Sequence, residues 1–275
     1  MPREILLANA AGFCTGVKRA IRKAEELPRA SIFGSLIHNP QEVARLEAQD
    51  KRMVKDPSAI VDEPVVVTAH GLDVKVLEEL KKKHRVVDLT CPLVTNIYKA
   101  GHKLQDEGYR IVIIGDPNHV EVKGIASRMK DPLIVNGPGD LEKVPQGSRV
   151  GVICQSTLLI DKFGKMVDLL KARCSWVEAV NTICKPTQRR QQSAEELSRT
   201  VEVMVVIGGR NSSNTHKLAE TCEAHRPGAT YHVETAQELR EEWFRGRKRV
   251  GVTAGASTPD YLIEECIATI RAYPD

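Results

Sequence analysis

Three of the seven cysteines occupy equivalent places along the chain, each after an apolar, strand-like run and before a helix-like stretch. They are Cys14, Cys91 and Cys184. In parallel sheets the carboxyl ends of the strands lie at one edge, and ligands bind there. Thiolates are soft ligands that suit zinc, copper and iron–sulfur clusters. The pattern therefore predicts one metal centre shared by three thiolates that are far apart in the sequence.

The number of thiolates limits the kind of metal centre. Structural zinc sites usually contain closely spaced CxxC pairs, and the chain contains no such pair. Iron–sulfur clusters are bound by cysteine thiolates, usually four. A cluster of four irons held by three thiolates leaves one iron that can act as a Lewis acid on a substrate oxygen. The count therefore favours a catalytic cluster over a pure electron carrier.

The other four cysteines do not occupy the repeated position. Cys222 and Cys266 fall in helical patterns and Cys154 falls in a strand-like run. We expect these thiols, and that of Cys174, to be free rather than metal-bound, the first three of them buried. Because Cys154 borders a polar turn, it stays open as an alternative ligand.

An internal repeat surrounds the three cysteines. After each cysteine come a helical pattern, an apolar run with a first polar turn, and later a second apolar run with a second polar turn. The first turns are His38-Asn39, Asn118-His119 and Asn211 to Asn214, and the second turns are Ala69-His70-Gly71, Gln155-Ser156-Thr157 and Gly255-Ala256-Ser257. Short apolar runs that alternate with helices predict parallel sheets built from right-handed βαβ units. We therefore predict an α/β fold of three repeats, at residues 1–91, 92–184 and 185–275, with all nine features at strand carboxyl ends.

Composition excludes several classes of protein. The chain is 41% hydrophobic and 28% charged, and no apolar run approaches the length of a membrane span. A net charge of +4 and an aromatic content of 4% argue against nucleic acid as a partner. The N-terminal segment has no apolar signal core, and seven cysteines do not suggest a disulfide framework. We expect a cytoplasmic protein.

Several motifs resemble those of one enzyme family. They are AGFCTGV at 11–17, AHG at 69–71, TCPLV at 90–94, NSSN at 211–214 and TAGASTPD at 253–260. In this order, and over essentially the whole chain, they resemble the LytB-type family of 4-hydroxy-3-methylbut-2-enyl diphosphate reductases. The resemblance implies three pseudo-symmetric α/β domains in a clover-like arrangement around a central 4Fe–4S cluster. It also implies the last step of the non-mevalonate isoprenoid pathway, in which an allylic hydroxyl bound to the open iron is removed reductively.

The resemblance also implies roles for individual residues. Cys14, Cys91 and Cys184 would bind the cluster, Glu121 would donate a proton, and Thr157 would relay protons near the substrate hydroxyl. An external donor of the ferredoxin or flavodoxin type would supply electrons. The diphosphate of the allylic substrate would be bound by His38, His70, His119, Ser212, Asn214 and Ser257, with Ser213 beside them.

The chemistry of these residue types agrees with the resemblance. Histidines supply hydrogen-bond donors and positive charge, and a helix N-terminus adds backbone N–H groups. The stretch from Asn211 to Asn214 suits an anion cradle, although helix capping alone is an alternative interpretation. Glu121 could be an ordinary exposed carboxylate, but no other carboxylate falls in these ligand turns, which makes it the best candidate for a general acid.

Two positions depart from the family pattern. Val120 stands where the family commonly has proline, and Lys185-Pro186 stands where a small or aromatic residue usually follows the third cysteine. These departures raise questions about the rigidity of one loop and the surroundings of the third thiolate.

Two other functions fit part of the pattern. One is an iron–sulfur dehydratase or reductase that acts on a different phosphorylated substrate, and the other is a non-enzymatic three-cysteine metal sensor. The basic stretches at 81–85 and 245–249 are either solvated surface or a docking site for an acidic electron donor.

Overall fold

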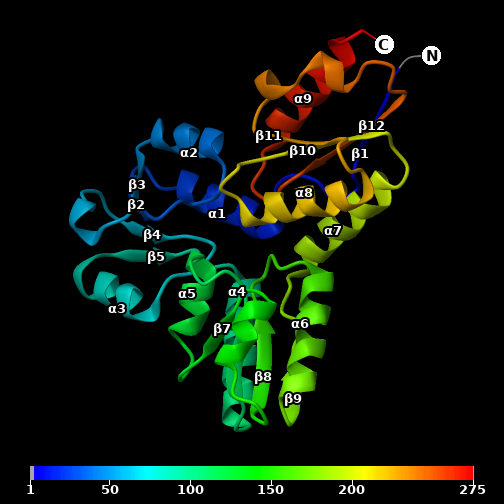
Figure 1. Cartoon of the computed structure of the whole chain (residues 1–275). Helices are drawn as coiled ribbons and strands as arrows, with labels where there is room; N and C mark the ends of the chain where they lie inside the picture. Colours follow the sequence, from blue (N-terminus) through cyan, green and yellow to red (C-terminus); the bar gives the residue numbers. More distant parts are fainter. Residues whose placement is uncertain (1–2, 275) are drawn as a thin grey trace. The chain divides into compact units, whose positions relative to one another are not determined.

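The computed structural model describes residues 3–274, which form three four-stranded parallel sheets with helices between the strands (Figure 1). The outer predicted domain limits, residues 1 and 275, lie outside the described residues. The strands are β1 (Glu4–Leu7), β2 (Ala30–Phe33), β3 (Lys51–Val54), β4 (Val65–Val67), β5 (Val86–Asp88), β6 (Arg110–Ile114), β7 (Leu133–Val135), β8 (Arg149–Cys154), β9 (Trp176–Ala179), β10 (Val203–Ile207), β11 (Thr230–Val233) and β12 (Arg249–Ala254). The α-helices are α1 (Thr15–Glu25), α2 (Pro40–Glu47), α3 (Val74–Lys83), α4 (Pro92–Asp106), α5 (Val120–Ala126), α6 (Ile160–Arg173), α7 (Lys185–Ser198), α8 (Ser213–His225) and α9 (Asp260–Ala272).

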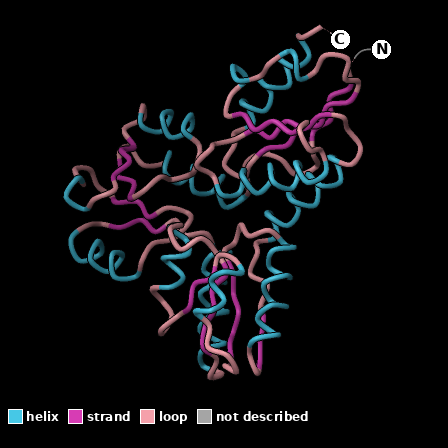
Figure 2. The backbone as a smooth tube through the Cα atoms, in the orientation of Figure 1, coloured by secondary structure: helices cyan, strands magenta, loops and turns pink. Residues whose placement is uncertain are grey.

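The three sheets have the same internal order. They read β1-β12-β10-β11, β5-β4-β2-β3 and β9-β8-β6-β7, and every pairing is parallel. The strand before each of the three equivalent cysteines is therefore an edge strand, and it pairs with the strand that leads to a second polar turn. Figure 2 shows the strands gathered in these sheets. The predicted α/β fold with three small parallel sheets is confirmed.

Spatial contacts between Cα atoms divide the chain into two compact units. The first unit contains the N-terminal segment up to Lys18, Ile37–Arg45 and the chain from Lys185 onward, with the sheet that contains β10. The second unit contains Arg19–Leu36 and Leu46–Cys184, with the other two sheets. Since β1 pairs with β12, the strand before Cys14 belongs to the third sheet. The internal domain limits near residues 91 and 184 stay a prediction.

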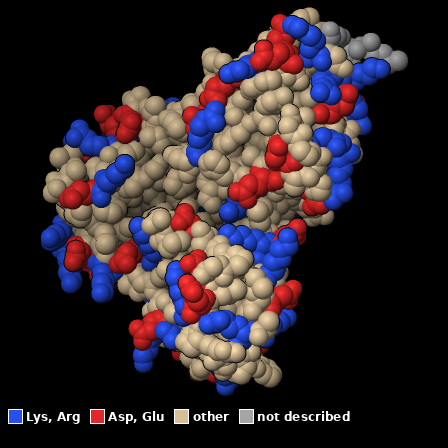
Figure 3. All heavy atoms as spheres, in the orientation of Figure 1, with Lys and Arg blue, Asp and Glu red and all other residues tan. Residues whose placement is uncertain are grey.

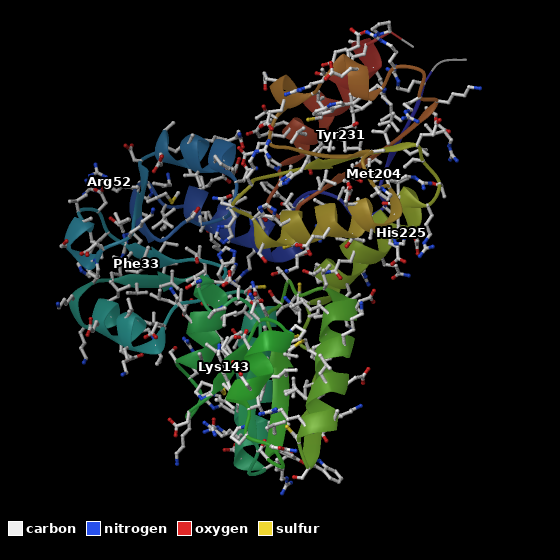
Figure 4. The ribbon with its side chains drawn as sticks, viewed as in Figure 1. Phe33, Arg52, Lys143, Met204, His225 and Tyr231 are labelled. Carbon is white, nitrogen blue, oxygen red and sulfur yellow. The ribbon has the colours of Figure 1, made fainter. Side chains whose placement is uncertain are left out.

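In the first unit both faces of the sheet are buried. Val205 on β10 packs in a cluster with Ile263 of α9, and its neighbour Met204 packs in another cluster with Leu218 of α8. Met204 and Tyr231, which lies on β11, are labelled in Figure 4. Because successive strand residues point to opposite faces, a sheet covered by helices on both sides needs a continuous apolar run. This explains the unbroken hydrophobic sequence of β10.

The second unit follows the same rule. On β8, Val152 and Cys154 pack with Leu170 of α6, whereas Ile153 packs on the opposite face with Ile97 of α4. Cys154 is fully buried in this core. Its side chain packs between β8 and α6 as a small apolar residue would.

Charges of both signs are interspersed over the face drawn in Figure 3. Among the helices of residues 3–274, none has both the length and the hydrophobicity that a membrane span requires.

Gly151 on β8 provides a test of this packing. A Cβ atom at this position would lie 2.9 Å from Leu104 Cβ and 3.0 Å from Tyr109 Cβ, both of which are close to their own backbones. We expect Gly151→Ala to lower the free energy of unfolding by about 1–3 kcal/mol through overpacking, as measured by urea titration. Gly139 has open space around its Cα atom, so Gly139→Ala is a matched control that should change stability by less than about 0.5 kcal/mol. Equal effects of the two substitutions would show that this site is not tightly packed.

Candidate active site

The same backbone hydrogen bond holds each of the three equivalent cysteines. In each case the cysteine N–H donates to a carbonyl of the second polar turn on the neighbouring strand. The pairs are Cys14 to Ala256 (3.2 Å), Cys91 to Ala69 (2.9 Å) and Cys184 to Ser156 (3.1 Å). The sequence repeat thus corresponds to a structural repeat in which every thiol adjoins a polar turn.

The surroundings of these thiols suit metal ligation. None of the three forms a disulfide, all three are half-buried, and α1, α4 and α7 each begin at the next residue. A helix N-terminus favours a thiolate over a thiol. In addition, the N–H of Val17 donates to Cys14 Sγ at 3.4 Å. The donor set therefore fits a thiolate-bound metal centre.

Three other cysteines do not fit that role. Burial raises the pKa of the thiols of Cys154 and Cys222 to about 11 and that of Cys266 to about 12. The expectation that these three are buried thiols is confirmed. Within residues 3–274 no group of three His, Cys, Asp or Glu side chains lies close enough to hold a metal ion. Because Cys14 belongs to the first unit and Cys91 and Cys184 to the second, their shared centre stays a prediction.

The first unit brings His38 and Ser257 together. Ser257 Oγ donates to the backbone carbonyl of His38 at 3.1 Å. Gly209 adjoins the same carbonyl, since a Cβ atom there would lie 2.5 Å from it. Burial lowers the pKa of His38. The Ser257 turn and Gly209, which precedes the turn at Asn211 to Asn214, therefore meet at the His38 backbone.

The N-terminus of α8 completes this group. Ser212 is the N-cap and accepts a hydrogen bond from the Thr215 N–H at 3.3 Å, while Ser213 is the first helical residue. The Nδ2 atom of Asn214 is buried and has no hydrogen-bond partner within the described residues. A buried donor without a partner costs about 1–3 kcal/mol, which a bound anion would remove. Helix capping explains Ser212 but leaves Asn214 unexplained.

Asn39 also has a buried amide nitrogen without a partner within the described residues, and it was not among the predicted site residues. It is fully buried, its Oδ1 atom accepts from the Glu42 N–H, and its Nδ2 atom has no partner within the described residues. Its position next to His38 in a first polar turn is the signal that could have identified it.

The second unit brings His70, His119 and Glu121 together. His119 is the N-cap of α5, and its Nδ1 atom accepts from the Glu121 N–H at 3.1 Å. This bond requires an unprotonated Nδ1, so the neutral ring carries its proton on Nε2 and can donate there. The rings of His70 and His119 meet edge to face, with centroids 5.9 Å apart.

Glu121 is buried and held by a single serine. Only 2% of its surface is exposed, and its carboxylate accepts from the N–H (2.6 Å) and the Oγ atom (2.7 Å) of Ser156. Burial raises the pKa of Glu121, although the two bonds from Ser156 act in the opposite direction. The interpretation of Glu121 as an ordinary exposed carboxylate is wrong. Instead, this carboxyl group is suited to hold a proton at higher pH than usual.

Thr157 lies in the same turn as Ser156. Its Oγ1 atom accepts from Nε2 of the buried Gln155 at 3.2 Å. The sequence pointed to Thr157 but missed Ser156, because only the tertiary contact shows which residue of the turn meets Glu121.

The turn that carries His70 is tied to the helix that carries Glu121. Gly71 has φ +77°, and a Cβ atom there would lie 2.2 Å from the hydroxyl of Tyr98. Arg128, just after α5, donates to the carbonyl of Leu72 at 2.7 Å and lies over the Tyr98 ring at 4.3 Å. These contacts fix His70 relative to α5 within the second unit.

The predicted site residues therefore form two groups. The group in the first unit contains Cys14, His38, Ser212, Ser213, Asn214 and Ser257. The group in the second unit contains His70, Cys91, His119, Glu121, Thr157 and Cys184. The first group is rich in hydrogen-bond donors for an anion, and the second provides a buried acid.

Comparisons with known proteins agree on one family. The family described as LytB protein matches residues 5–271. The chain is 44% identical over 271 residues to the 4-hydroxy-3-methylbut-2-enyl diphosphate reductase of a Nitratiruptor species, with 98% of each chain covered. It is 41% identical over 276 residues to the protein of the same name from Geobacter sulfurreducens, again with 98% of each covered.

The chain is also similar to two solved structures of diphosphate reductases. A structure described as (E)-4-hydroxy-3-methyl-but-2-enyl diphosphate reductase, the terminal enzyme of the non-mevalonate pathway, is 38% identical with a TM-score of 0.71. It covers 98% of this chain and 99% of its own. The E-1-hydroxy-2-methyl-but-2-enyl-4-diphosphate reductase from Plasmodium falciparum is 26% identical with a TM-score of 0.92, covering 100% and 90%.

The raised pKa of Glu121 predicts a pH dependence of stability. When a carboxyl has a higher pKa in the folded state, folding favours its protonated form, so stability falls as pH rises from the unfolded value of about 4.3 through the folded value. Glu121→Gln removes this titration. We expect urea unfolding to show that wild type loses stability relative to Glu121→Gln across that window. A constant difference between about pH 4 and about pH 8 would contradict the raised pKa.

Proposed function

Because the chain belongs to the LytB family, we propose that the protein reduces (E)-4-hydroxy-3-methylbut-2-enyl diphosphate to isopentenyl and dimethylallyl diphosphates. This would be the last step of the non-mevalonate pathway, carried out in the cytoplasm. The observation that carries the proposal is the buried Glu121 carboxyl, held by Ser156 beside two histidines. A buried acid with a raised pKa is what protonation of a leaving hydroxyl requires.

An iron–sulfur cofactor is supported by family membership and by the three half-buried thiols. We assign to Cys14, Cys91 and Cys184 the binding of one 4Fe–4S cluster. When bound, such a cluster supplies electrons and, at an iron without a thiolate, Lewis acidity. The residues of the chain would bind the substrate and supply a proton.

We propose that hydrogen-bond donors of the first unit bind the diphosphate. Asn214 Nδ2 and Asn39 Nδ2 are buried donors without partners within the described residues, and the N-terminus of α8 adds backbone N–H groups. The hydroxyls of Ser212, Ser213 and Ser257 and the ring of His38 would add to this set. The rings of His70 and His119 are further proposed donors to the diphosphate.

Proton delivery would follow from the environment of Glu121. Reductive removal of a hydroxyl consumes two electrons and two protons, and the products are water and the alkene diphosphate. The raised pKa favours the protonated form of Glu121, and Ser156 fixes the carboxyl group while Thr157 would pass the proton to the leaving oxygen. The second proton adds to either end of the allylic carbon skeleton, which accounts for two products.

Electrons would come from an external protein of the ferredoxin or flavodoxin type. Such donors are acidic, so a basic surface such as the one formed by residues 81–85 suits them. Electron stoichiometry separates this function from a dehydratase acting on another phosphorylated substrate, since a dehydratase consumes no electrons. A metal sensor would show no turnover at all.

Glu121→Gln tests the role of the buried acid. We expect a loss of kcat of about 10²–10⁴-fold, because the amide fits the same pocket but has no acidic proton. Turnover with a chemical reductant is measured in anaerobically purified protein. The absorbance and EPR signal of the cluster should stay unchanged.

The exposed Glu142 of the same unit provides the control. Glu142→Gln should retain wild-type turnover. Full activity of Glu121→Gln would disprove the proton-donor role.

Asn214→Asp tests the anion site in the first unit. This substitution exchanges a buried donor for a carboxylate that repels the diphosphate, so we expect KM to rise by about 10–100-fold with a smaller change in kcat. Steady-state kinetics measures both constants. An unchanged KM would show that the substrate does not bind at this residue.

A further inference from the structure

Two arginines each bind the backbone just before one of the proposed cluster ligands. Arg19 on α1 donates through Nη2 to the carbonyls of Leu89 (3.1 Å) and Thr90 (3.0 Å), which directly precede Cys91. Arg19 and these carbonyls all belong to the second unit.

Arg190 makes the corresponding contact in the first unit. It lies on α7 and donates through Nη2 to the carbonyl of Gly12, two residues before Cys14, and through Nη1 to the carbonyl of Pro186 (3.0 Å). Pro186 in turn lies two residues after Cys184. Arg190 therefore ties together the backbone next to two proposed ligands.

The two contacts follow one rule. Arg19 lies on the helix that begins after Cys14 and reaches the turn before Cys91, whereas Arg190 lies on the helix that begins after Cys184 and reaches the turn before Cys14. Each arginine thus connects the helix that follows one proposed ligand to the backbone before another.

Both arginine side chains are at least partly buried, so water screens their positive charges only weakly. Arg190 is 5% exposed. Arg19 is half-buried, makes no ion pair with a carboxylate within the described residues, and keeps its Nε atom buried without a hydrogen-bond partner there. Hydrogen bonds and net charge around a cluster set its reduction potential, and positive charge stabilises the reduced, more negative state.

We propose that Arg19 and Arg190 are positioning residues of the iron–sulfur centre, which hold the backbone before Cys91 and Cys14 and raise the reduction potential through their charge. This inference rests on the proposed function, because it requires the cluster. It goes beyond that function by assigning two residues that bind neither iron nor substrate.

The test compares Arg190→Met and Arg19→Met with the charge-conserving Arg190→Lys in anaerobically purified, cluster-loaded protein. Two quantities are measured: the midpoint potential, by EPR-monitored redox titration, and the rate of iron release to a chelator. Both methionine variants should show a lower midpoint potential, and iron release should be about ten-fold faster. Arg190→Lys should retain the potential but release iron faster than wild type, since lysine lacks the guanidinium fork.

Matched controls separate this role from a purely structural one. Arg226 donates to the carbonyl of Val201 at the amino end of β10 in the first unit, and Arg173 donates to the carbonyl of Val144 in the second. Arg226→Met and Arg173→Met should lower thermal stability without changing the midpoint potential. An equal shift of potential in these controls would overturn the proposal.

The remaining outcomes distinguish failure of the positioning role from failure of the proposed function. A loaded cluster with unchanged potential and unchanged iron release in Arg190→Met and Arg19→Met would overturn the positioning role and leave the proposed function intact. Wild-type protein without iron and sulfide would overturn the proposed function, and the positioning role with it. If Arg190→Met does not fold, Arg19→Met and Arg190→Lys decide the question.

Discussion

The hydrogen bond from each cysteine N–H to the second polar turn is the contact on which the candidate site depends. The edge strand pairs in parallel with its neighbour, and hydrogen bonds between the two segments continue past the ends of the strands as far as the cysteine. A change of register by one residue would turn the side chains of that strand to the opposite face. The apolar clusters on both faces of the sheets prevent such a change, so core packing fixes the place of each thiol.

The polar turns carry costs that the hydrophobic cores must offset. Glu121 is buried, and the amides of Asn39 and Asn214 lack partners within the described residues. Each feature lowers the stability of the ligand-free protein, and each becomes favourable when a proton or an anion is present. Natural proteins depart from full polar satisfaction mainly at functional sites. The two groups of residues therefore indicate function independently of any similarity to other proteins.

The repeat and most candidate residues could be predicted from the sequence, because strand–cysteine–helix spacing and polar turns are local signals. Ser156, Arg19 and Arg190 could not be predicted, since their roles come from contacts between segments that are distant along the chain.

The structure explains how Val120 can replace the proline that is common in the family. Val120 is the first residue of α5, a position where proline is favoured but not required, and the His119 cap fixes the start of the helix in its absence.

The repeat shows how one backbone arrangement supports three different chemistries. The second polar turn carries His70 in one sheet, Ser156 and Thr157 in another, and Ser257 in the third, yet its carbonyl accepts the cysteine N–H in every case. Because that bond uses only backbone atoms, side chains in these turns can differ without displacing the thiol. The backbone bond therefore fixes the position of the cysteine, whereas the side chains of the second polar turn are free to differ between repeats. This separation allows a buried acid to stand in one repeat and anion donors in the others.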